Sequence, residues 1–201
     1  MIKRLVAVAA TLLAAVIPLS ASAQAEGPWL IRGRALWMSP TNGNDPEISA
    51  GKVEADDKLF PEIDFTYFFT PNIAAELVLT YPQKHDITLA GTKVGSIKQI
   101  PPTLLVQYHF MPTAEFRPYV GAGLNYTYFT DEQLPPGITI DNSSFGPAIQ
   151  AGFDYKLAPQ WYLNVDLKYV WISIDIKDAV GPILTLDIDP ILFSVGIGYR
   201  F

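Results

Sequence analysis

The carboxyl-terminal segment, from Ile191 to Phe201, alternates without a break between two kinds of position. One face carries only apolar residues: Ile191, Phe193, Val195, Ile197, Tyr199 and Phe201. The other face is small or polar, apart from Leu192. A period of two predicts a β-strand with unlike faces, and a wholly apolar face is typical of the lipid-facing wall of a closed barrel. A strand of a water-soluble protein shows the same alternation, so the rest of the chain must distinguish the two.

The amino-terminal segment predicts export. Lys3 and Arg4 precede an apolar run at 5–17, and small residues at 21–23 follow it. This order is that of a secretory signal peptide, which we expect at residues 1–23, followed by a single outer-membrane β-barrel domain at 24–201. The alternative is a membrane anchor, which needs an apolar run of about 20 residues, and this run is shorter.

The composition of the chain narrows the choice of fold. It is 49% hydrophobic, with a mean hydropathy of +0.20, yet no further apolar run reaches the length of a spanning helix. In lipid, a chain without such helices satisfies its backbone only as a closed barrel. The chain has no cysteine, so its stability does not depend on disulfides. Acidic residues number 20 against 14 basic ones, which excludes a nucleic-acid partner.

Eight alternating segments follow the signal peptide. We expect strands at 28–38, 58–69, 73–81, 99–110, 117–128, 145–155, 161–172 and near 191–201. Long polar segments at 39–56, 82–96, 130–143 and 175–184 alternate with short turns near 70–72, 112 and 158–159. The fold class predicted is all-β, an eight-stranded antiparallel transmembrane β-barrel with four long extracellular loops and three short periplasmic turns. A soluble, lipocalin-like barrel is the alternative, but it would bury the face that carries tryptophan and expose a face poor in apolar residues.

Four segments resemble the OmpW and AlkL family of small outer-membrane barrels. They are Thr70 to Leu77, Leu104 to Tyr108, Phe116 to Gly123 and Gly198 to Phe201. The resemblance implies an eight-stranded barrel in the outer membrane of a Gram-negative bacterium, with a role in passive entry of small hydrophobic molecules. It also implies a hydrophobic constriction formed by inward residues at Val78 and Lys168. Lys168 departs from the family pattern, which favours an aromatic residue there, although a lysine stem still packs along apolar surface.

The inward faces of the predicted strands sort by height. Charged residues in the middle and periplasmic half predict a polar plug: Arg32, Arg34, Glu62, Asp64, Glu76, Arg117, Asp154, Asp166 and Arg200. Mostly apolar residues nearer the outside predict a hydrophobic lumen: Leu36, Met38, Phe60, Val78, Leu105, Phe129, Lys168, Val170, Ile172, Ile188 and Leu192. We therefore expect hydrophobic solutes to enter from outside and to be stopped by the charged floor.

Prolines within the expected strands suggest a lateral exit to the membrane. Pro101, Pro102, Pro147 and Pro190 lack the donor that a β-ladder needs, so they predict a weak seam in the wall. The alternative is that these prolines only bend strands near the rim.

A second alternative concerns the whole protein, because eight-stranded barrels barely enclose their own side chains. The chain would then be a non-transporting structural or surface-interaction barrel.

Catalysis and metal binding receive little support from the sequence. The two histidines are His85, in a polar loop, and His109, for which we expect a hydrogen bond to a neighbouring carboxylate. No nucleophile motif surrounds Ser96, Ser143 or Ser144, and no metal-ligand spacing is present. We expect no cofactor. The expected partners are outer-membrane lipids and lipopolysaccharide, small hydrophobic solutes, and the barrel-assembly machinery through Phe201; acidic loops that bind lipopolysaccharide through divalent cations are a lesser hypothesis.

Overall fold

The computed structural model describes residues 26–39, 53–54, 58–89, 92–133, 137, 139–177 and 181–201. The expected signal peptide at 1–23 lies outside the described residues. Within them, no helix is long and apolar enough to cross a membrane.

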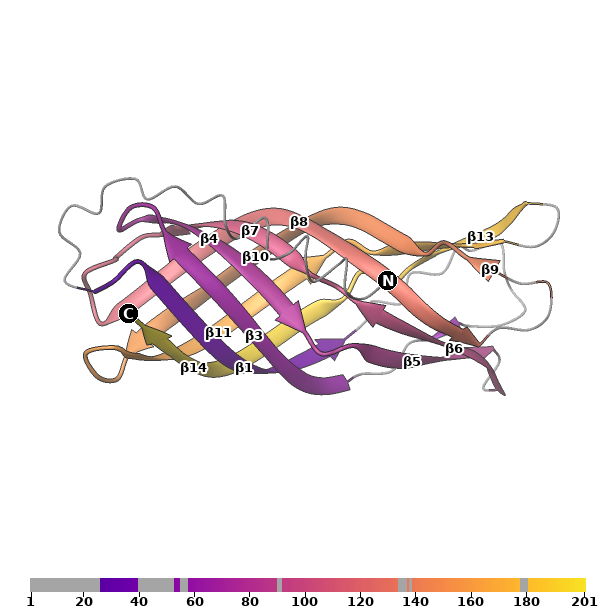
Figure 1. The fold of residues 1–201 in the computed structure, drawn as a ribbon, viewed down its shortest axis with the longest axis horizontal. Coiled ribbons are helices and arrows are strands. Elements are labelled where there is room, and N and C mark those ends of the chain that lie inside the picture. Colours follow the sequence, from indigo (N-terminus) through magenta and orange to yellow (C-terminus); the bar gives the residue numbers. More distant parts are fainter. Residues whose placement is uncertain are drawn as a thin grey trace.

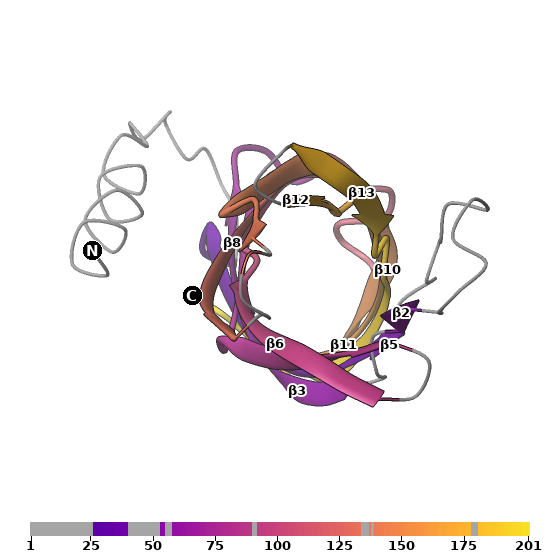
Figure 2. The same cartoon turned by 90° about the vertical axis from the view of Figure 1, so that its right-hand side faces the viewer.

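Eight antiparallel strands close into a barrel. They are β1 (Trp29–Ser39), β3 (Lys58–Phe68), β4 (Ile73–Thr80), β7 (Thr103–His109), β8 (Phe116–Gln133), β10 (Ser143–Lys156), β11 (Trp161–Val170) and β14 (Ile191–Arg200). Each strand pairs with the next along this order, and β14 returns to β1 in a register that runs from Leu30↔Arg200 to Ser39↔Ile191. Figure 1 shows the tilted wall from the side and Figure 2 shows the closed ring along its axis. The predicted fold class is confirmed.

The faces of the wall follow the alternation of the sequence. On β3, Asp64 is fully buried in the interior, whereas Leu59 on the outer face is 66% exposed. Aromatic rings cluster on the outside, with Trp29 edge-on to Tyr67 at 4.8 Å and Trp161 to Tyr199 at 5.0 Å. A wholly apolar outer face with aromatic rings at its ends suits a lipid environment.

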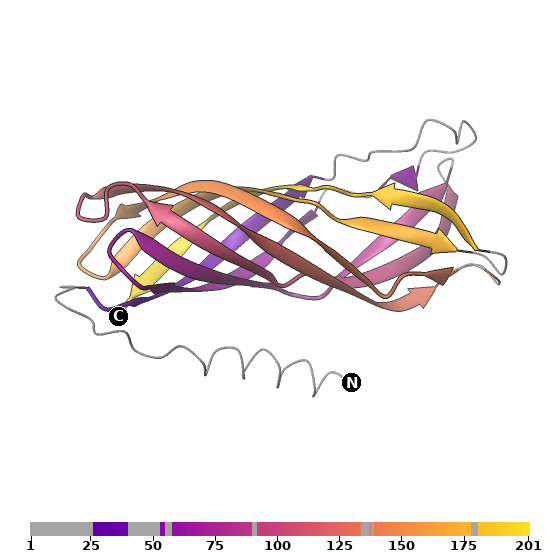
Figure 3. The ribbon, with the colours of Figure 1, turned by 90° about the horizontal axis from the view of Figure 1, so that it is seen from above.

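The two ends of the barrel differ in their connections. At one end, which we call the turn end, short turns join the strands and Phe201 lies near them (Figure 1). Thr70 shapes one of these turns, because its hydroxyl accepts hydrogen bonds from the amides of Asn72 and Ile73. At the other end, which we call the loop end, the wall extends well past the closed ring (Figure 3).

Short strands make up the extensions at the loop end. They are β2 (Val53–Glu54), β5 (Gln83–Leu89), β6 (Thr92–Ile100), β9 (Thr139–Ile140), β12 (Ser173–Lys177) and β13 (Pro182–Asp187). The polar segments at 82–96 and 175–184 were predicted as loops, and that part of the prediction is wrong. Backbone pairing within an antiparallel hairpin satisfies the peptide groups whatever the polarity of the side chains. The expected continuous strand at 99–110 is also divided, because Pro101 and Pro102 separate β6 from β7.

Candidate solute path through the barrel

Arg32 and Arg34 organise the middle of the interior because they occupy successive inward positions of β1. The Arg32 guanidinium donates to both carboxylate oxygens of Asp154, at 3.0 and 2.8 Å, and to Asp64 at 2.8 Å. The β1–β3 register places Arg32 opposite Asp64 and Arg34 opposite Glu62. Pairing of the strands therefore brings the opposite charges together.

Arg34 and Lys168 complete this charged layer. Arg34 Nε lies 2.6 Å from Glu62 Oε1, and its Nη2 lies 2.8 Å from Asp64 Oδ2 and 3.0 Å from Glu76 Oε1. Lys168 Nζ lies 2.6 Å from Asp166 Oδ1 and donates to Glu62 Oε1 at 3.3 Å. Three cations thus face five carboxylates, all of them buried: Arg32, Arg34, Lys168, Glu62, Asp64, Glu76, Asp154 and Asp166. We call this group the polar plug.

A second charged group lies at the turn end, around Glu26. Its carboxylate accepts hydrogen bonds from Arg117 Nη1 and Tyr162 OH, both at 2.7 Å, and from Lys156. Arg200 Nη1 lies 3.6 Å from Glu26 Oε2, and Arg200 Nε donates to the Gly27 carbonyl at 2.9 Å. We call these five side chains the Glu26 cluster. Arg117 and Arg200, which we expected in the polar plug, bind here instead.

The electrostatics of the Glu26 cluster favour the ionised carboxylate. Partial burial alone would raise the pKa of Glu26, but hydrogen bonds from Arg117, Lys156 and Tyr162 outweigh it and lower the pKa from 4.5 to about 2. The sequence offered no signal for this role, because Glu26 precedes the first strand and belongs to no alternating pattern.

Apolar and aromatic side chains fill the space between the polar plug and the turn end. Leu30, Phe68, Ala74 and Tyr162 form a buried cluster there. Tyr119 donates to Asp166 at 2.8 Å and so ties this layer to the polar plug. His109 lies between the rings of Phe68 and Tyr119. Its Nε2 lies 3.1 Å from Gln107 Oε1, so its side-chain partner is an amide rather than the carboxylate we expected.

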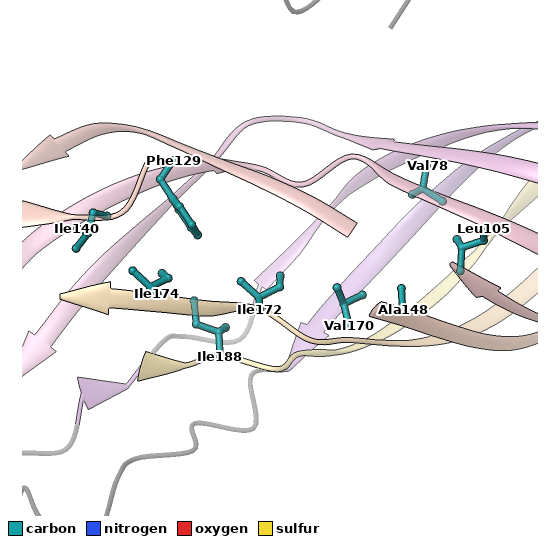
Figure 4. Close-up of a cluster of buried hydrophobic side chains, with 9 residues drawn as sticks. All are labelled: Val78, Leu105, Phe129, Ile140, Ala148, Val170, Ile172, Ile174 and Ile188. Atoms are coloured by element: carbon teal, nitrogen blue, oxygen red, sulfur yellow. The ribbon is translucent and has the colours of Figure 1, made fainter. Parts of the chain in front are cut away.

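An open cavity lies on the loop side of the polar plug. The space inside it that a water-sized molecule can reach is about 30 Å³. Eight of the predicted lumen residues line it: Leu36, Met38, Phe60, Val78, Lys168, Val170, Ile172 and Leu192. The other three, Leu105, Phe129 and Ile188, are buried in an apolar cluster together with Val78, Val170 and Ile172. Figure 4 shows these side chains projecting toward one another from opposite walls.

Polar side chains also line the cavity, and the sequence did not single them out. Thr80, Gln99, Thr103 and Asn125 lie along one wall, and Glu62 and Lys168 contribute from the polar plug. Asn125 Nδ2 donates to Thr103 Oγ1 at 2.9 Å and to the Pro102 carbonyl at 3.3 Å. The alternation along each strand predicted that these residues point inward. It could not predict that they lie at the same position along the barrel axis, because that depends on the register between strands.

Strand pairing beside the cavity is interrupted at Pro101 and Pro102. The β4–β7 register ends at Val78↔Thr103, and the β5–β6 register begins at Gln83↔Gln99. Residues 79–82 and 100–102 therefore lie opposite each other between these two registers and belong to neither. Pro82, Pro101 and Pro102 have no amide hydrogen to donate across this gap, although the Pro102 carbonyl accepts from Tyr126 N on the other side at 3.0 Å.

The other two prolines of the predicted seam lie where the wall is joined. Pro147 sits within the continuous β8–β10 register, opposite Leu124, and its carbonyl accepts from Trp171 N at 3.1 Å. Pro190 lines the cavity at the junction of β13 and β14. There the wall is held by Ile188 N donating to Ile172 O at 2.9 Å and by Ile172 N donating to Asp189 Oδ1 at 2.9 Å. The gap in pairing is therefore at Pro101 and Pro102.

No group of three or more histidine, aspartate or glutamate side chains among the described residues is arranged to hold a metal ion. The side chain of His85 is outside the part of the chain whose side chains the structure describes.

Comparisons with known proteins agree with this architecture. The outer membrane protein W of Escherichia coli K12 is 33% identical over 196 residues, which cover 90% of this chain and 92% of that protein. The uncharacterized outer-membrane protein y4mB of Sinorhizobium fredii is 39% identical, over 87% of this chain and 80% of that protein. The crystal structure of the outer membrane protein OprG from Pseudomonas aeruginosa matches with a TM-score of 0.72 and 30% identity, over 88% and 97% of the two chains.

The model of the OmpW family matches residues 25–201, which is nearly all of the chain that follows the expected signal peptide. Relatives that cover most of both sequences are named as outer-membrane proteins of Gram-negative bacteria. This chain is therefore a member of the OmpW family, an eight-stranded β-barrel of the Gram-negative outer membrane.

Proposed function

We propose that this barrel allows passive uptake of small hydrophobic molecules through an apolar extracellular funnel with a lateral exit to the membrane. The observation that carries the proposal is the position of the cavity. It is lined mainly by apolar side chains, it lies above a buried charged layer, and it adjoins the interruption in strand pairing at Pro101 and Pro102.

Entry follows from the lining of the cavity. With the turn end facing the periplasm, the loop end faces outward, as in outer-membrane barrels generally. A hydrophobic molecule gains free energy when its surface leaves water, at roughly 25 cal/mol per Å² buried. Leu36, Val78, Val170 and Leu192 offer such a surface.

Straight passage along the barrel axis is unfavourable. Arg32, Arg34 and Lys168 fill the interior together with the carboxylates they bind. An apolar molecule that displaced these pairs would leave buried charges without partners, which costs several kcal/mol for each charge. The gap beside Pro101 and Pro102 leads instead from the cavity toward the hydrocarbon of the membrane.

The surroundings of the barrel supply the other partners we propose. Outer-membrane lipids contact the apolar outer face, and lipopolysaccharide surrounds the loop end. Phe201 is a candidate recognition residue for the barrel-assembly machinery, because the residue is 49% exposed while its amide donates to the Trp29 carbonyl at 2.9 Å. We propose no catalytic role, since the path described requires only binding and diffusion.

Restoring the missing donors tests the lateral exit. In the double variant Pro101→Thr, Pro102→Val, the strand regains two amide hydrogens and a residue pair of high β-propensity, so pairing can extend across the gap. We expect the initial rate of uptake of an aromatic ester to fall to near that of cells without the protein. The measurement uses a Gram-negative host that lacks its own members of this family.

Pro118→Val is the matched control. Pro118 lies in β8 near the turn end, opposite Phe153, and does not line the cavity. This variant should take up the ester at the wild-type rate. If the wild type gives no more uptake than cells without the protein, the transport proposal is wrong and the barrel is a structural or surface-interaction protein.

A further inference from the structure

The cavity contains an unused hydrogen-bond acceptor at its charged floor. Glu62 is 3% exposed and lines the cavity, and its Oε2 atom has no hydrogen-bond partner. Its other oxygen, Oε1, is occupied, with Arg34 Nε at 2.6 Å and Lys168 Nζ at 3.3 Å. The two oxygens of this carboxylate therefore differ: one is fixed by the polar plug, and the other is buried beside the cavity without a hydrogen-bond partner.

A second polar atom lies across the strands from Glu62. Thr80 is directly opposite it in the β3–β4 register, also lines the cavity, and its hydroxyl oxygen has no hydrogen-bond partner. The Cβ atoms of such a pair are about 4.5–5.5 Å apart. Thr80 ends β4, where the interruption in strand pairing begins. Thr80 thus lies where the cavity meets the gap in the wall, and Glu62 lies one strand away, on β3.

We infer that the cavity selects apolar molecules that carry one hydroxyl group, such as phenols and alkanols. The hydroxyl donates to Glu62 Oε2 and accepts from the Thr80 hydroxyl, while the apolar body contacts side chains such as Val78 and Leu36. This inference rests on the proposed function and adds the class of solute. It excludes carboxylates, because the polar plug already has five carboxylates to three cations and would repel another anion.

Discrimination arises from what happens to Glu62 when the cavity is filled. An apolar group seated against Oε2 leaves a buried carboxylate oxygen without a partner, whereas a hydroxyl satisfies it. Hydrogen bonds to charged groups are strong enough to change affinity by about tenfold or more. A site built around a hydroxyl accordingly rejects the analogue that lacks one.

Fluorine NMR on the full mature protein in lipid nanodiscs tests this with three probes of similar size. They are 4-fluorophenol, 4-fluoroanisole and 4-fluorobenzoate, and each affinity is corrected for partition into protein-free nanodiscs. We expect 4-fluorophenol to bind at least about tenfold more tightly than 4-fluoroanisole, which has no donor, and 4-fluorobenzoate to bind most weakly.

Glu62→Gln should abolish the preference between the first two probes. Arg34 and Lys168 hold an oxygen at the Oε1 position, so the amide nitrogen of the new side chain takes the place of Oε2. The cavity then offers a donor in place of the acceptor, and the oxygen atoms of 4-fluorophenol and 4-fluoroanisole can both accept from it. Ser194→Ala is the control, because Ser194 Oγ is also buried without a hydrogen-bond partner but does not line the cavity. It should retain the wild-type preference.

The outcomes separate this inference from the proposed function. If wild-type protein binds phenol and anisole equally, the cavity takes hydrophobic molecules but the hydroxyl preference is wrong. If it binds none of the three probes, the proposed function fails and the preference fails with it. The ratio of the wild-type affinities for 4-fluorophenol and 4-fluoroanisole tests the hydroxyl preference even if the Glu62→Gln variant does not fold.

Discussion

Individual charged residues hold the interior of this barrel together. Arg32 is fully buried, and its guanidinium makes bidentate contact with Asp154 as well as contact with Asp64. A planar guanidinium binds two carboxylates in fixed directions, which a lysine ammonium cannot reproduce. The conformation of the polar plug therefore depends on arginine at this position.

Replacing Arg32 should be costly for stability. Arg32→Met leaves Asp154 without the cation that binds it and Asp64 with Arg34 alone, and we expect the free energy of unfolding to fall by about 3–5 kcal/mol. Arg32→Lys keeps the charge and should lose less. Urea unfolding in lipid vesicles, followed by tryptophan fluorescence, measures both. A methionine variant as stable as the wild type would show that the plug contributes nothing to stability.

Glu26 should make stability depend on pH. Its pKa is lowered to about 2 in the folded protein against 4.5 unperturbed, so its contribution is fully present above about pH 4.5 and is lost as the pH falls toward 2. At pH 7 we expect Glu26→Gln to be less stable than the wild type by about 1 kcal/mol, given its partial exposure. The difference should vanish near pH 2.

The control for Glu26 is Glu115→Gln, which changes an exposed carboxylate near the same end of the barrel. Unfolding in urea at pH 7, 4 and 2.5 should show no difference between this variant and the wild type. A constant deficit of Glu26→Gln at all three values would contradict the assignment of the effect to the charge of Glu26.

At the scale of strands, close packing of the wall depends on glycine at inward positions. A Cβ atom on Gly123 of β8 would lie 1.9 Å from the Leu104 carbonyl oxygen and 2.6 Å from Leu105 Cα, both on the neighbouring β7. These are backbone atoms, which cannot rotate away. Gly33 of β1 is the opposite case, because a Cβ atom there meets nothing within 4 Å.

Substitution by alanine should separate these two glycines. Gly123→Ala forces β7 and β8 apart, and we expect it to lower the free energy of unfolding by about 1–3 kcal/mol. Gly33→Ala adds a methyl group to the outer face and should change the free energy of unfolding by no more than about 0.5 kcal/mol. The same urea titration measures both variants, and equal effects would refute the packing argument.

At the scale of the whole molecule, the barrel is a stack of layers with different chemistry. From the turn end come the Glu26 cluster, the apolar layer around Phe68, the polar plug, and the cavity. Two charged layers close the path to the periplasm. The cavity lies on the outer side of both charged layers, and the transport path that we propose begins there.

Filling that cavity should stop uptake without unfolding the barrel. Val78 points inward and is 3% exposed, so Val78→Trp should fill the cavity and reduce the uptake of an aromatic ester at least tenfold. Val106→Trp makes the same exchange at a position that is 59% exposed on the outer face. It should leave uptake unchanged. Loss of uptake in both variants would indicate damage to the fold rather than a blocked path.

The alternation of residues along the sequence predicted most of the fold, because each barrel strand buries every second side chain. The inward positions of Arg32, Glu62, Asp154 and Asp166 followed from alternation within single strands. Their mutual contacts did not, since register and closure decide which inward residues share a height. Alternation therefore placed Arg117 inside but could not show that Glu26 would bind it.

The prolines of the predicted seam show the same limit of prediction from single strands. Four of them were equivalent in the sequence, because each lacks a donor. The structure distinguishes them by what surrounds each: Pro147 lies within a continuous register, Asp189 bridges the wall beside Pro190, and only Pro101 and Pro102 face a gap. Hydrogen bonds from neighbouring side chains and to neighbouring carbonyls replace the donor that a proline lacks. The sequence of one strand does not show whether they form.

The junction between β1 and β14 has a consequence for how the molecule is made. Arg200 Nε reaches the Gly27 carbonyl across 173 positions of sequence, and the register on either side joins the first barrel strand to the last. Contacts between such distant residues carry a large entropic cost and form late. The cylinder cannot close until the final strand has paired with the first, so the apolar faces of the earlier strands have no closed barrel to belong to while the chain folds, which favours aggregation.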